Sequence, residues 1–368
     1  MFLESNQKIR PLGAMGFIHD DLSNGCYRVM FNMDDGFFLI REDNSFTLPA
    51  KLYGNTALRA DKVFNTFLSR NHSTGVLMSG DKGSGKTLLA RMICLKAIEA
   101  GYPVIICDGN SNIAHPGFAK FLSDIKTPFV GFFDEFEKNF EKVQEQSSLL
   151  SLMDGLSKNK SLFLLTSNNK EAVNPFMLDR PGRIYYYFEY SQLDDEVVKE
   201  FCADKGVADT EISIIVKHHK ILGLNMDSLV SVIEEMGRYS IGFREAVIDM
   251  NVGVGKREFR VYTAQISMDG HRSDVVENFH FDMVSDIQFY WKADEIKSFF
   301  EKYGHHEKIK AVIDNHLDDD GDIYVDVSGE NIINLDDETG DVFLDFGIPG
   351  LVLVLSEKKR KRTGKFMV

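Results

Sequence analysis

The sequence predicts an α/β fold, in which a parallel sheet covered by helices forms the middle of the chain. Between residues 56 and 190, short apolar runs rich in β-branched and aromatic residues alternate with longer stretches of helical spacing. Buried strands that alternate with helices are typical of a parallel sheet with both faces covered. At roughly 150 residues per domain, the 368 residues suffice for two or three domains.

The composition is that of an ordinary globular protein, with 43% hydrophobic and 27% charged residues and a net charge of −14. No apolar run reaches the roughly 20 residues that a membrane span needs, and the first residues lack the pattern of a secretory signal. The four cysteines lie far apart, without metal-binding spacing, which fits a reducing compartment. We therefore expect a cytoplasmic protein with no membrane segment. The acidic balance argues weakly against a general nucleic-acid binder.

Residues 1–55 are predicted to form a small β-rich N-terminal domain. Apolar stretches at 26–32 and 37–41 flank Met33-Asp34-Asp35-Gly36, a hairpin signal with glycine where the turn needs a positive φ. A shorter stretch at 46–48 is a candidate third strand.

The middle domain, 56–190, is predicted from its alternating elements. Its expected strands are short and apolar, at 75–79, 102–107, 129–133, 161–166 and 185–189. Its expected helices lie between them, at 87–100, 116–125, 147–156 and 175–178. This order gives the α/β class of the domain.

Two further domains are predicted after the sheet. Residues 191–253 carry Val, Ile, Leu and Phe at helical spacing and are expected to form a compact helical bundle. Residues 254–368 are expected to form an α+β domain, with strands at 259–268, 323–327, 342–346 and 351–355 and helices within 293–317. This domain ends in a basic tail at 358–362, which follows an acidic segment at 314–345. We interpret the tail as a solubilising end or a contact of the acidic segment, with nucleic acid or anionic lipid as the alternative partner.

A phosphate-binding loop is the strongest motif of the chain. The run from Gly80 to Thr87 fits GxxxxGK[ST] at every constrained position, between an apolar strand and a helix. Glycines let the backbone wrap around phosphate oxygens, and the helix N-terminus adds positive potential. Lys86 is expected to bridge the β- and γ-phosphates of ATP, and the Thr87 hydroxyl to ligate Mg²⁺. The predicted ATP-binding residues are Gly80, Asp81, Lys82, Gly83, Ser84, Gly85, Lys86, Thr87 and Leu88.

The predicted strand 129–133 ends in two adjacent carboxylates, Asp134 and Glu135. The carboxyl ends of the strands face the ligand in an open α/β sheet. Asp134 is expected to hold Mg²⁺ directly or through water, and Glu135 to orient or deprotonate the attacking water. Consecutive strand residues point to opposite faces, so the two carboxylates take separate roles unless the strand has already ended.

These residues resemble the AAA+ superfamily, and within it the AAA proteins proper. The phosphate loop and Phe-Phe-Asp134-Glu135 look like its Walker A and Walker B motifs, and the segment 149–156 is similar to its Leu-Met-Asp-Gly helix end. Leu165-Thr166-Ser167-Asn168 looks like the sensor-1 strand, which implies that Asn168 helps to position the attacking water. The resemblance implies a P-loop NTPase sheet with a helical lid, the AAA+ module.

The same resemblance assigns roles to three arginines. Asn174-Pro175 followed by Arg180-Pro181-Gly182-Arg183 resembles the arginine-finger segment, although one more residue than in the family separates Pro175 from Arg180. The resemblance implies that Arg180 and Arg183 reach the γ-phosphate of a neighbouring subunit. Arg244 matches the sensor-2 position of the lid and would act on the nucleotide of its own chain.

The sequence thus predicts a Mg²⁺-dependent ATPase whose sites form between the subunits of a homo-oligomeric ring, most simply a hexamer, and which remodels a macromolecular client. A protein client is favoured over nucleic acid. The loop after Cys107 lacks the aromatic-aliphatic-glycine triplet of substrate-threading pores, so the resemblance does not extend to threading. A nucleic-acid motor or loader that uses the basic tail is one alternative, and an ATP-controlled assembly scaffold is another.

Overall fold

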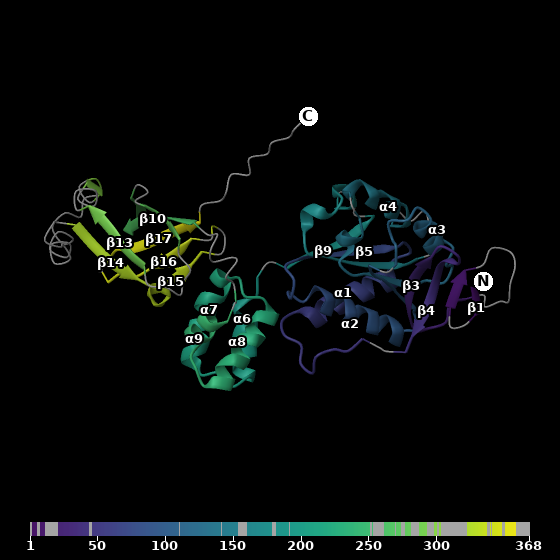
Figure 1. The fold of residues 1–368 in the computed structure, drawn as a ribbon, viewed down its shortest axis with the longest axis horizontal. Helices are drawn as coiled ribbons and strands as arrows, with labels where there is room; N and C mark the ends of the chain where they lie inside the picture. Colours follow the sequence, from purple (N-terminus) through teal and green to yellow (C-terminus); the bar gives the residue numbers. More distant parts are fainter. Residues whose placement is uncertain are drawn as a thin grey trace, which may run out of the picture. The chain divides into compact units, whose positions relative to one another are not determined.

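The chain divides into two compact units, Met1–Ser191 and Gln192–Val368. In the computed structural model each unit has its own sheet and its own helices (Figure 1). The division lies beside the boundary predicted at residue 190, while the finer domain boundaries stay predictions. The residues that the structure describes are 2–5, 8–11, 21–43, 46–109, 111–140, 142–153, 160–178, 182–190, 192–250, 252, 261–268, 270–273, 277–280, 287–292, 298–299, 302, 322–336, 339, 341–347 and 350–357.

The first unit is built on a nine-stranded sheet with the order β1-β2-β4-β3-β6-β7-β8-β5-β9. Its run from β3 to β9 is parallel, and β1, β2 and β4 are antiparallel to their neighbours. The strands are β1 (Phe2–Ser5), β2 (Lys8–Pro11), β3 (Cys26–Asn32), β4 (Gly36–Glu42), β5 (Thr74–Gly80), β6 (Val104–Cys107), β7 (Val130–Phe133), β8 (Leu162–Ser167) and β9 (Ile184–Tyr190). The predicted α/β class is confirmed.

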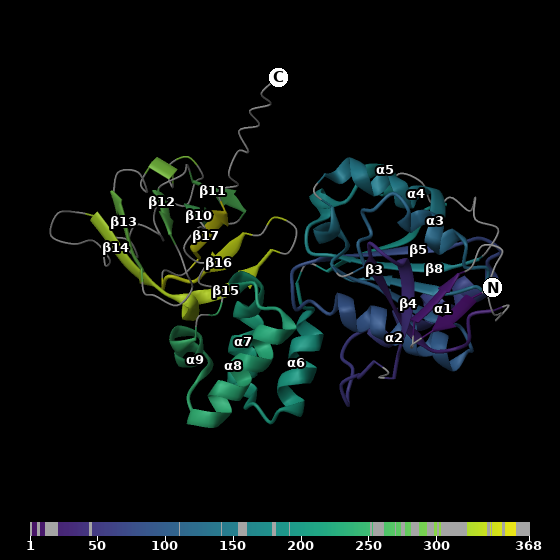
Figure 2. The same ribbon diagram turned by 45° about the vertical axis from the view of Figure 1, so that its right-hand side comes forward.

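Helices cover both faces of this sheet (Figures 1 and 2). They are α1 (Thr56–Ser69), α2 (Lys86–Glu99), α3 (Phe118–Ser123), α4 (Ser147–Met153) and α5 (Pro175–Leu178), with short 3₁₀ turns η1 (Phe136–Asn139), η2 (Val143–Gln146) and η3 (Lys170–Ala172). Strand β5 shows the alternation that this requires: Val76 and Met78 belong to the core that includes α1 and α2, whereas Leu77 belongs to the core on the other face, which includes α3, α4 and α5. Both faces of the strand are buried, which explains its continuous apolar sequence.

The described strands of the N-terminal segment, β1 to β4, belong to this same sheet, whereas the sequence predicted a small β-rich domain for residues 1–55. Strand β3 pairs in parallel with β6, from Cys26 opposite Val104 to Arg28 opposite Ile106, and β4 completes the hairpin. Tyr27 and Val29 have no exposed surface and join the core on one face, while Cys26 joins the core on the other. A strand with buried apolar side chains on both faces is stabilised inside a large sheet rather than at the surface of a small domain.

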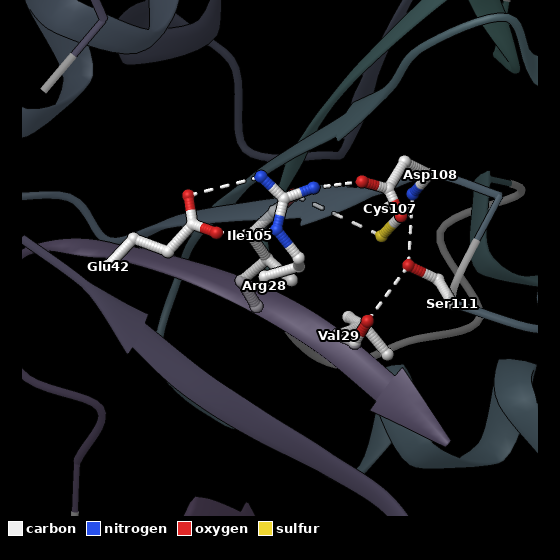
Figure 3. A network of polar contacts seen from close by, with 7 residues as sticks. All are labelled: Arg28, Val29, Glu42, Ile105, Cys107, Asp108 and Ser111. Carbon is white, nitrogen blue, oxygen red and sulfur yellow. Dashed lines mark hydrogen bonds and ion pairs between the residues drawn. The ribbon is translucent and has the colours of Figure 1, made fainter. Parts of the chain in front are cut away.

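A polar network fixes the hairpin to the end of β6 (Figure 3). Arg28 Nη1 donates to Asp108, and Arg28 Nη2 lies 3.2 Å from Glu42 Oε2. The fully buried Ser111 accepts a hydrogen bond from the Asp108 backbone N–H at 2.9 Å and donates to the Val29 carbonyl at 3.0 Å. The loop after β6 is therefore held by the N-terminal hairpin.

The second unit begins with four helices, α6 (Asp195–Asp204), α7 (Asp209–Leu222), α8 (Met226–Tyr239) and α9 (Phe243–Asp249). Each buries an apolar stripe, such as Leu229, Val232, Ile233 and Met236 on α8. Asn225 caps α8 through a hydrogen bond of 2.8 Å from Ser228 N to Asn225 Oδ1.

An antiparallel sheet follows these helices, with the order β11-β10-β17-β16-β15 and β12 paired to β10. Its strands are β10 (Val261–Met268), β11 (His271–Arg272), β12 (Glu277–His280), β15 (Ile332–Leu335), β16 (Val342–Leu344) and β17 (Val352–Glu357), and β13 (Ile287–Lys292) pairs with β14 (Asp322–Val327) as a separate ribbon. A 3₁₀ turn η4 (Gly329–Asn331) joins this sheet to α7, because His218 Nε2 lies 3.0 Å from the Gly329 carbonyl oxygen. The predicted basic tail 358–362 and most of the predicted helical stretch 293–317 lie outside the described residues.

Within the part of the chain that the structure describes, no helix is both long enough and apolar enough to cross a membrane.

Candidate nucleotide site

The phosphate loop connects β5 to α2, as its sequence predicted. Gly80 has a φ of 149°, and a Cβ there would lie 2.0 Å from the Tyr190 carbonyl oxygen, so only glycine fits beside β9. Gly85 has a φ of 97° and is the N-cap of α2, which begins at Lys86. The loop therefore leads directly into the N-terminus of α2, whose backbone N–H groups and dipole favour a bound anion.

Lys86 is buried within this loop, with only 5% of its surface exposed. Its Nζ donates to the carbonyl oxygens of Gly80 and Asp81, each at 2.7 Å, and reaches Ser84 Oγ at 3.4 Å. Burial lowers the pKa of Lys86, and the carboxylates around the site oppose that effect. The ammonium group therefore sits at the centre of the loop, where its charge is little screened by solvent.

Thr87 and Asp134 lie together, as the motifs predicted. Thr87 Oγ1 donates to Asp134 Oδ1 at 3.3 Å, and the same oxygen accepts a bond of 2.7 Å from Thr166 Oγ1. A hydroxyl and a carboxylate are hard oxygen donors of the kind that Mg²⁺ takes beside substrate phosphates and water. Within the part of the chain that the structure describes, no group of three or more His, Cys, Asp or Glu side chains is placed to hold a metal ion.

Glu135 stands in a left-handed backbone conformation, with φ 48° and ψ 47°. Strand β7 ends at Phe133, so the side chains of Asp134 and Glu135 need not point to opposite faces of the sheet, and both residues contact the end of β8 or the residue after it. The Glu135 backbone N–H donates to Thr166 Oγ1 at 2.9 Å. Such a conformation in a residue other than glycine is strained and is concentrated at functional sites.

The Glu135 carboxylate is held from two sides. Lys138 Nζ lies 2.7 Å from Oε2, and Asn168 Nδ2 donates to Oε1 at 2.9 Å. These contacts, with Lys138 first, lower the pKa of Glu135 and keep it ionised at neutral pH. The structure thus brings together Glu135 and Asn168, the two residues that the sequence assigned to the attacking water.

Sequence reasoning missed Thr166, Glu137 and Lys138. Thr166 lies within the motif that resembles sensor 1 but has no predicted role, although the change from apolar to hydroxyl residues at the end of β8 is the signal that marks it. Glu137 accepts a hydrogen bond of 2.9 Å from the Asn168 backbone N–H, and only its place after the acidic pair marks it in sequence.

Of the three predicted arginines, the structure describes Arg183 and Arg244. Arg183 is only 9% exposed, and its Nη1 donates to the Phe176 carbonyl oxygen at 2.7 Å. Arg180 lies outside the described residues, and Arg244 lies on α9 of the second unit. Their predicted roles stay predictions.

Residues 76–190 match the family model of the ATPase family associated with various cellular activities (AAA). The ATP-dependent zinc metalloprotease FtsH of Heterosigma akashiwo is 33% identical over 131 residues, which are 30% of this chain and 19% of that protein. FtsH 5 of the Arabidopsis thaliana chloroplast is 32% identical over 140 residues, 32% of this chain and 19% of that protein. The chain thus spans about a fifth of the length of these relatives.

Two solved structures show a distant likeness. AMPPCP-bound DnaA from Aquifex aeolicus has a TM-score of 0.40 and 17% identity, over 59% of this chain and 71% of that one. DnaA bound to AMPPCP and single-stranded DNA has a TM-score of 0.37 and 16% identity, over 51% of this chain and 62% of that one. On the family match and on the phosphate loop and acidic strand end that lie within it, residues 76–190 belong to the AAA+ ATPase superfamily.

Proposed function

We propose that the protein is a Mg²⁺-dependent ATPase, which transfers the γ-phosphoryl group of ATP to water. The observation that supports this most is the hydrogen-bonded chain from Thr87 through Asp134 and Thr166 to Glu135 and Asn168, which joins the phosphate loop to the ends of β7 and β8. In reactions of this class the protein contributes positioning and charge rather than covalent chemistry. Each group in this hydrogen-bonded network contributes either positioning or charge.

The phosphate loop would bind the nucleotide. Backbone N–H groups of residues 80–88 would bind the phosphate oxygens, and the Lys86 ammonium would bridge the β- and γ-phosphates. Thr87 and Asp134 would hold Mg²⁺, which neutralises charge on the phosphates when it is bound. The buried position of Lys86 strengthens its attraction for these anions.

The residues at the ends of β7 and β8 would activate and position the attacking water. Glu135 would accept a proton from the attacking water or orient it, and the Asn168 amide, which already contacts that carboxylate, would position the same water. The hydrogen bonds from Thr166 fix both Asp134 and the backbone of Glu135. A preorganised arrangement of this kind spares reorganisation in the transition state.

The site would be completed by a neighbouring copy of the chain, in a ring that is most simply a hexamer. Arg180 and Arg183 would supply cations to the nucleotide of that neighbour, and Arg244 would act on the nucleotide of its own chain. The resemblance of their sequence context supports these roles. A macromolecular client, more readily a protein, would be remodelled by the resulting motions. The zinc protease activity named for the relatives is not carried over, because the match covers about a fifth of those proteins.

The test is ATP turnover per subunit, measured over a wide range of protein concentration with Mg²⁺ and with EDTA. We expect turnover that requires Mg²⁺, rises steeply with protein concentration and then saturates, since sites made by two subunits need assembly. A rate that is measurable but independent of concentration would contradict the shared sites. Absence of turnover at every concentration, with no nucleotide bound, would contradict the ATPase proposal itself.

A further inference from the structure

A third carboxylate, Glu137, lies beside the candidate catalytic pair. It belongs to the turn η1, which is anchored by Phe136, a side chain with no exposed surface. Glu137 Oε1 accepts a hydrogen bond of 2.9 Å from the backbone N–H of Asn168, the first residue after β8. The turn after β7 is thereby tied directly to the end of β8.

The other oxygen of this carboxylate is buried and unsatisfied. Within the described chain, Glu137 Oε2 has almost no accessible surface and no hydrogen-bond partner. A buried carboxylate oxygen without a partner costs free energy. Its presence in the fold points to a functional need for the contact that the other oxygen of Glu137 makes with the Asn168 backbone.

The charge of Glu137 also reaches the phosphate loop. Burial lowers the pKa of Lys86, and among the carboxylates that oppose this effect Glu137 comes first, ahead of Asp81 and Asp134. Glu137 is thus in the electrostatic environment of the loop as well as in contact with the segment that carries Asn168.

We propose that Glu137 is a positioning residue for ATP hydrolysis, which holds the backbone of Asn168 so that the Asn168 amide stays against Glu135. This inference rests on the proposed function. Glu137 fixes the main chain of Asn168 at 2.9 Å, and Asn168 in turn fixes Glu135 Oε1 at 2.9 Å. Without the first contact Glu135 loses its orientation toward the water, whereas the phosphate loop keeps its own contacts and still binds ATP.

The test compares single-turnover hydrolysis with nucleotide affinity in the full chain. Glu137→Ala is expected to lower the hydrolysis rate about 10- to 100-fold and to change the affinity for a fluorescent ATP analogue by about twofold at most, because only the orientation of Glu135 is lost. Glu137→Gln keeps an acceptor for the Asn168 N–H and is expected to recover a large part of the rate. Glu99→Gln, at the exposed end of α2, is the matched control and should behave as wild type.

A double-mutant cycle distinguishes positioning through Asn168 from general damage. If Glu137 acts through Asn168, the variant that combines Glu137→Ala with Asn168→Ala is no slower than Asn168→Ala alone. Losses that multiply, or a wild-type rate in Glu137→Ala, would overturn the inference while leaving the ATPase proposal intact. A wild-type chain without turnover would overturn both.

Amide hydrogen exchange at Asn168 gives a readout that needs no activity. The Asn168 amide hydrogen is expected to exchange slowly in the wild type and in Glu137→Gln, and faster in Glu137→Ala, since its acceptor is gone. Equal protection in all three proteins would show that Glu137 does not hold Asn168, and would overturn the inference even if Glu137→Ala proved too unstable for kinetics.

Discussion

Two polar networks lie at the ends of neighbouring parallel strands in the first unit. Asp108 follows β6 and pairs with Arg28, and Asp134 follows β7 and contacts the phosphate loop. In the first network one guanidinium lies between Asp108 and Glu42, and the buried hydroxyl of Ser111 uses both its donor and its acceptor (Figure 3). The groups of this network satisfy one another.

In the second network, at the end of β7, the described residues do not satisfy every polar group. Glu135 pairs with a lysine that is 60% exposed, and Glu137 keeps a buried oxygen without a partner in the described chain. The strand geometry is the same in both places, so the position at a strand end does not by itself make a site. What distinguishes the two is whether polar groups remain for a ligand after the protein has satisfied its own.

The largest effect is expected from a substitution in the phosphate loop, which contacts the network at the end of β7 through Thr87. Lys86→Ala removes the buried ammonium from the phosphate loop and is expected to abolish measurable ATP binding and turnover, because the loop loses the cation that would bridge the β- and γ-phosphates. Titration with a fluorescent ATP analogue measures the binding. Lys96→Ala, later in α2 and paired with Asp61 at 2.6 Å, is the control and should bind normally. Binding in Lys86→Ala at wild-type affinity would contradict the site.

A smaller loss is expected from the hydroxyl that joins the two strand ends. Thr166→Val keeps the shape of the side chain but removes the bonds to Asp134 and to the backbone of Glu135. Turnover should fall about 10- to 100-fold, and the free energy of unfolding by about 1–3 kcal/mol, since two half-buried partners each lose a hydrogen bond. Steady-state kinetics and urea unfolding measure the two quantities. Thr210→Val, on the exposed face of α7, should change neither, and an unchanged rate in Thr166→Val would remove Thr166 from the network.

The closed network should respond in stability rather than in chemistry. Arg28→Ala leaves Asp108 and Glu42 without their shared cation, and we expect a loss of about 1–2 kcal/mol, between the values for exposed and for buried ion pairs. Turnover per folded molecule should stay close to wild type. Urea unfolding and kinetics on the same sample decide this. A loss of turnover with unchanged stability would mean that the two networks are not separate in function.

The smallest effect concerns a buried thiol on the same hairpin. Burial first, and then the charge of Glu42, raise the pKa of Cys26 to about 11 from 9.0. Because the folded protein binds this proton more tightly than the unfolded chain, its contribution to stability is complete below pH 9 and is lost as the pH rises toward about 11. We expect the free energy of unfolding to decline over that window, and Cys26→Ser to weaken the decline. Rapid alkylation of Cys26 in the native protein at pH 8 would contradict its burial.

Local signals in the sequence were sufficient for the phosphate loop and for the acidic strand end. Gly80, Gly85 and Lys86 are fixed by the needs of a short turn, and Asp134 follows an uninterrupted apolar strand. These features need no knowledge of distant residues. The strands from β3 to β9 were predicted for the same reason, since each carries its own apolar run, whereas β1 and β2 were not predicted.

Features that depend on distant pairing could not be predicted in the same way. Nothing near Cys26 in the sequence indicates that it lies opposite Val104, so the N-terminal hairpin was expected to be a separate domain. Glu137 and Thr166 matter only because β7 and β8 are neighbours in the sheet. A charged residue in a turn and a threonine in a strand are ordinary until that pairing is known.

The central claim is that Glu135 activates water at a site that binds ATP independently of it. The most direct test is Glu135→Gln, with nucleotide affinity and hydrolysis measured on the same protein. The account predicts ATP affinity close to that of the wild type and turnover reduced by about 100-fold or more, because the amide keeps the size of the carboxylate but cannot accept the proton. Turnover that persisted in Glu135→Gln at near the wild-type rate would contradict the account.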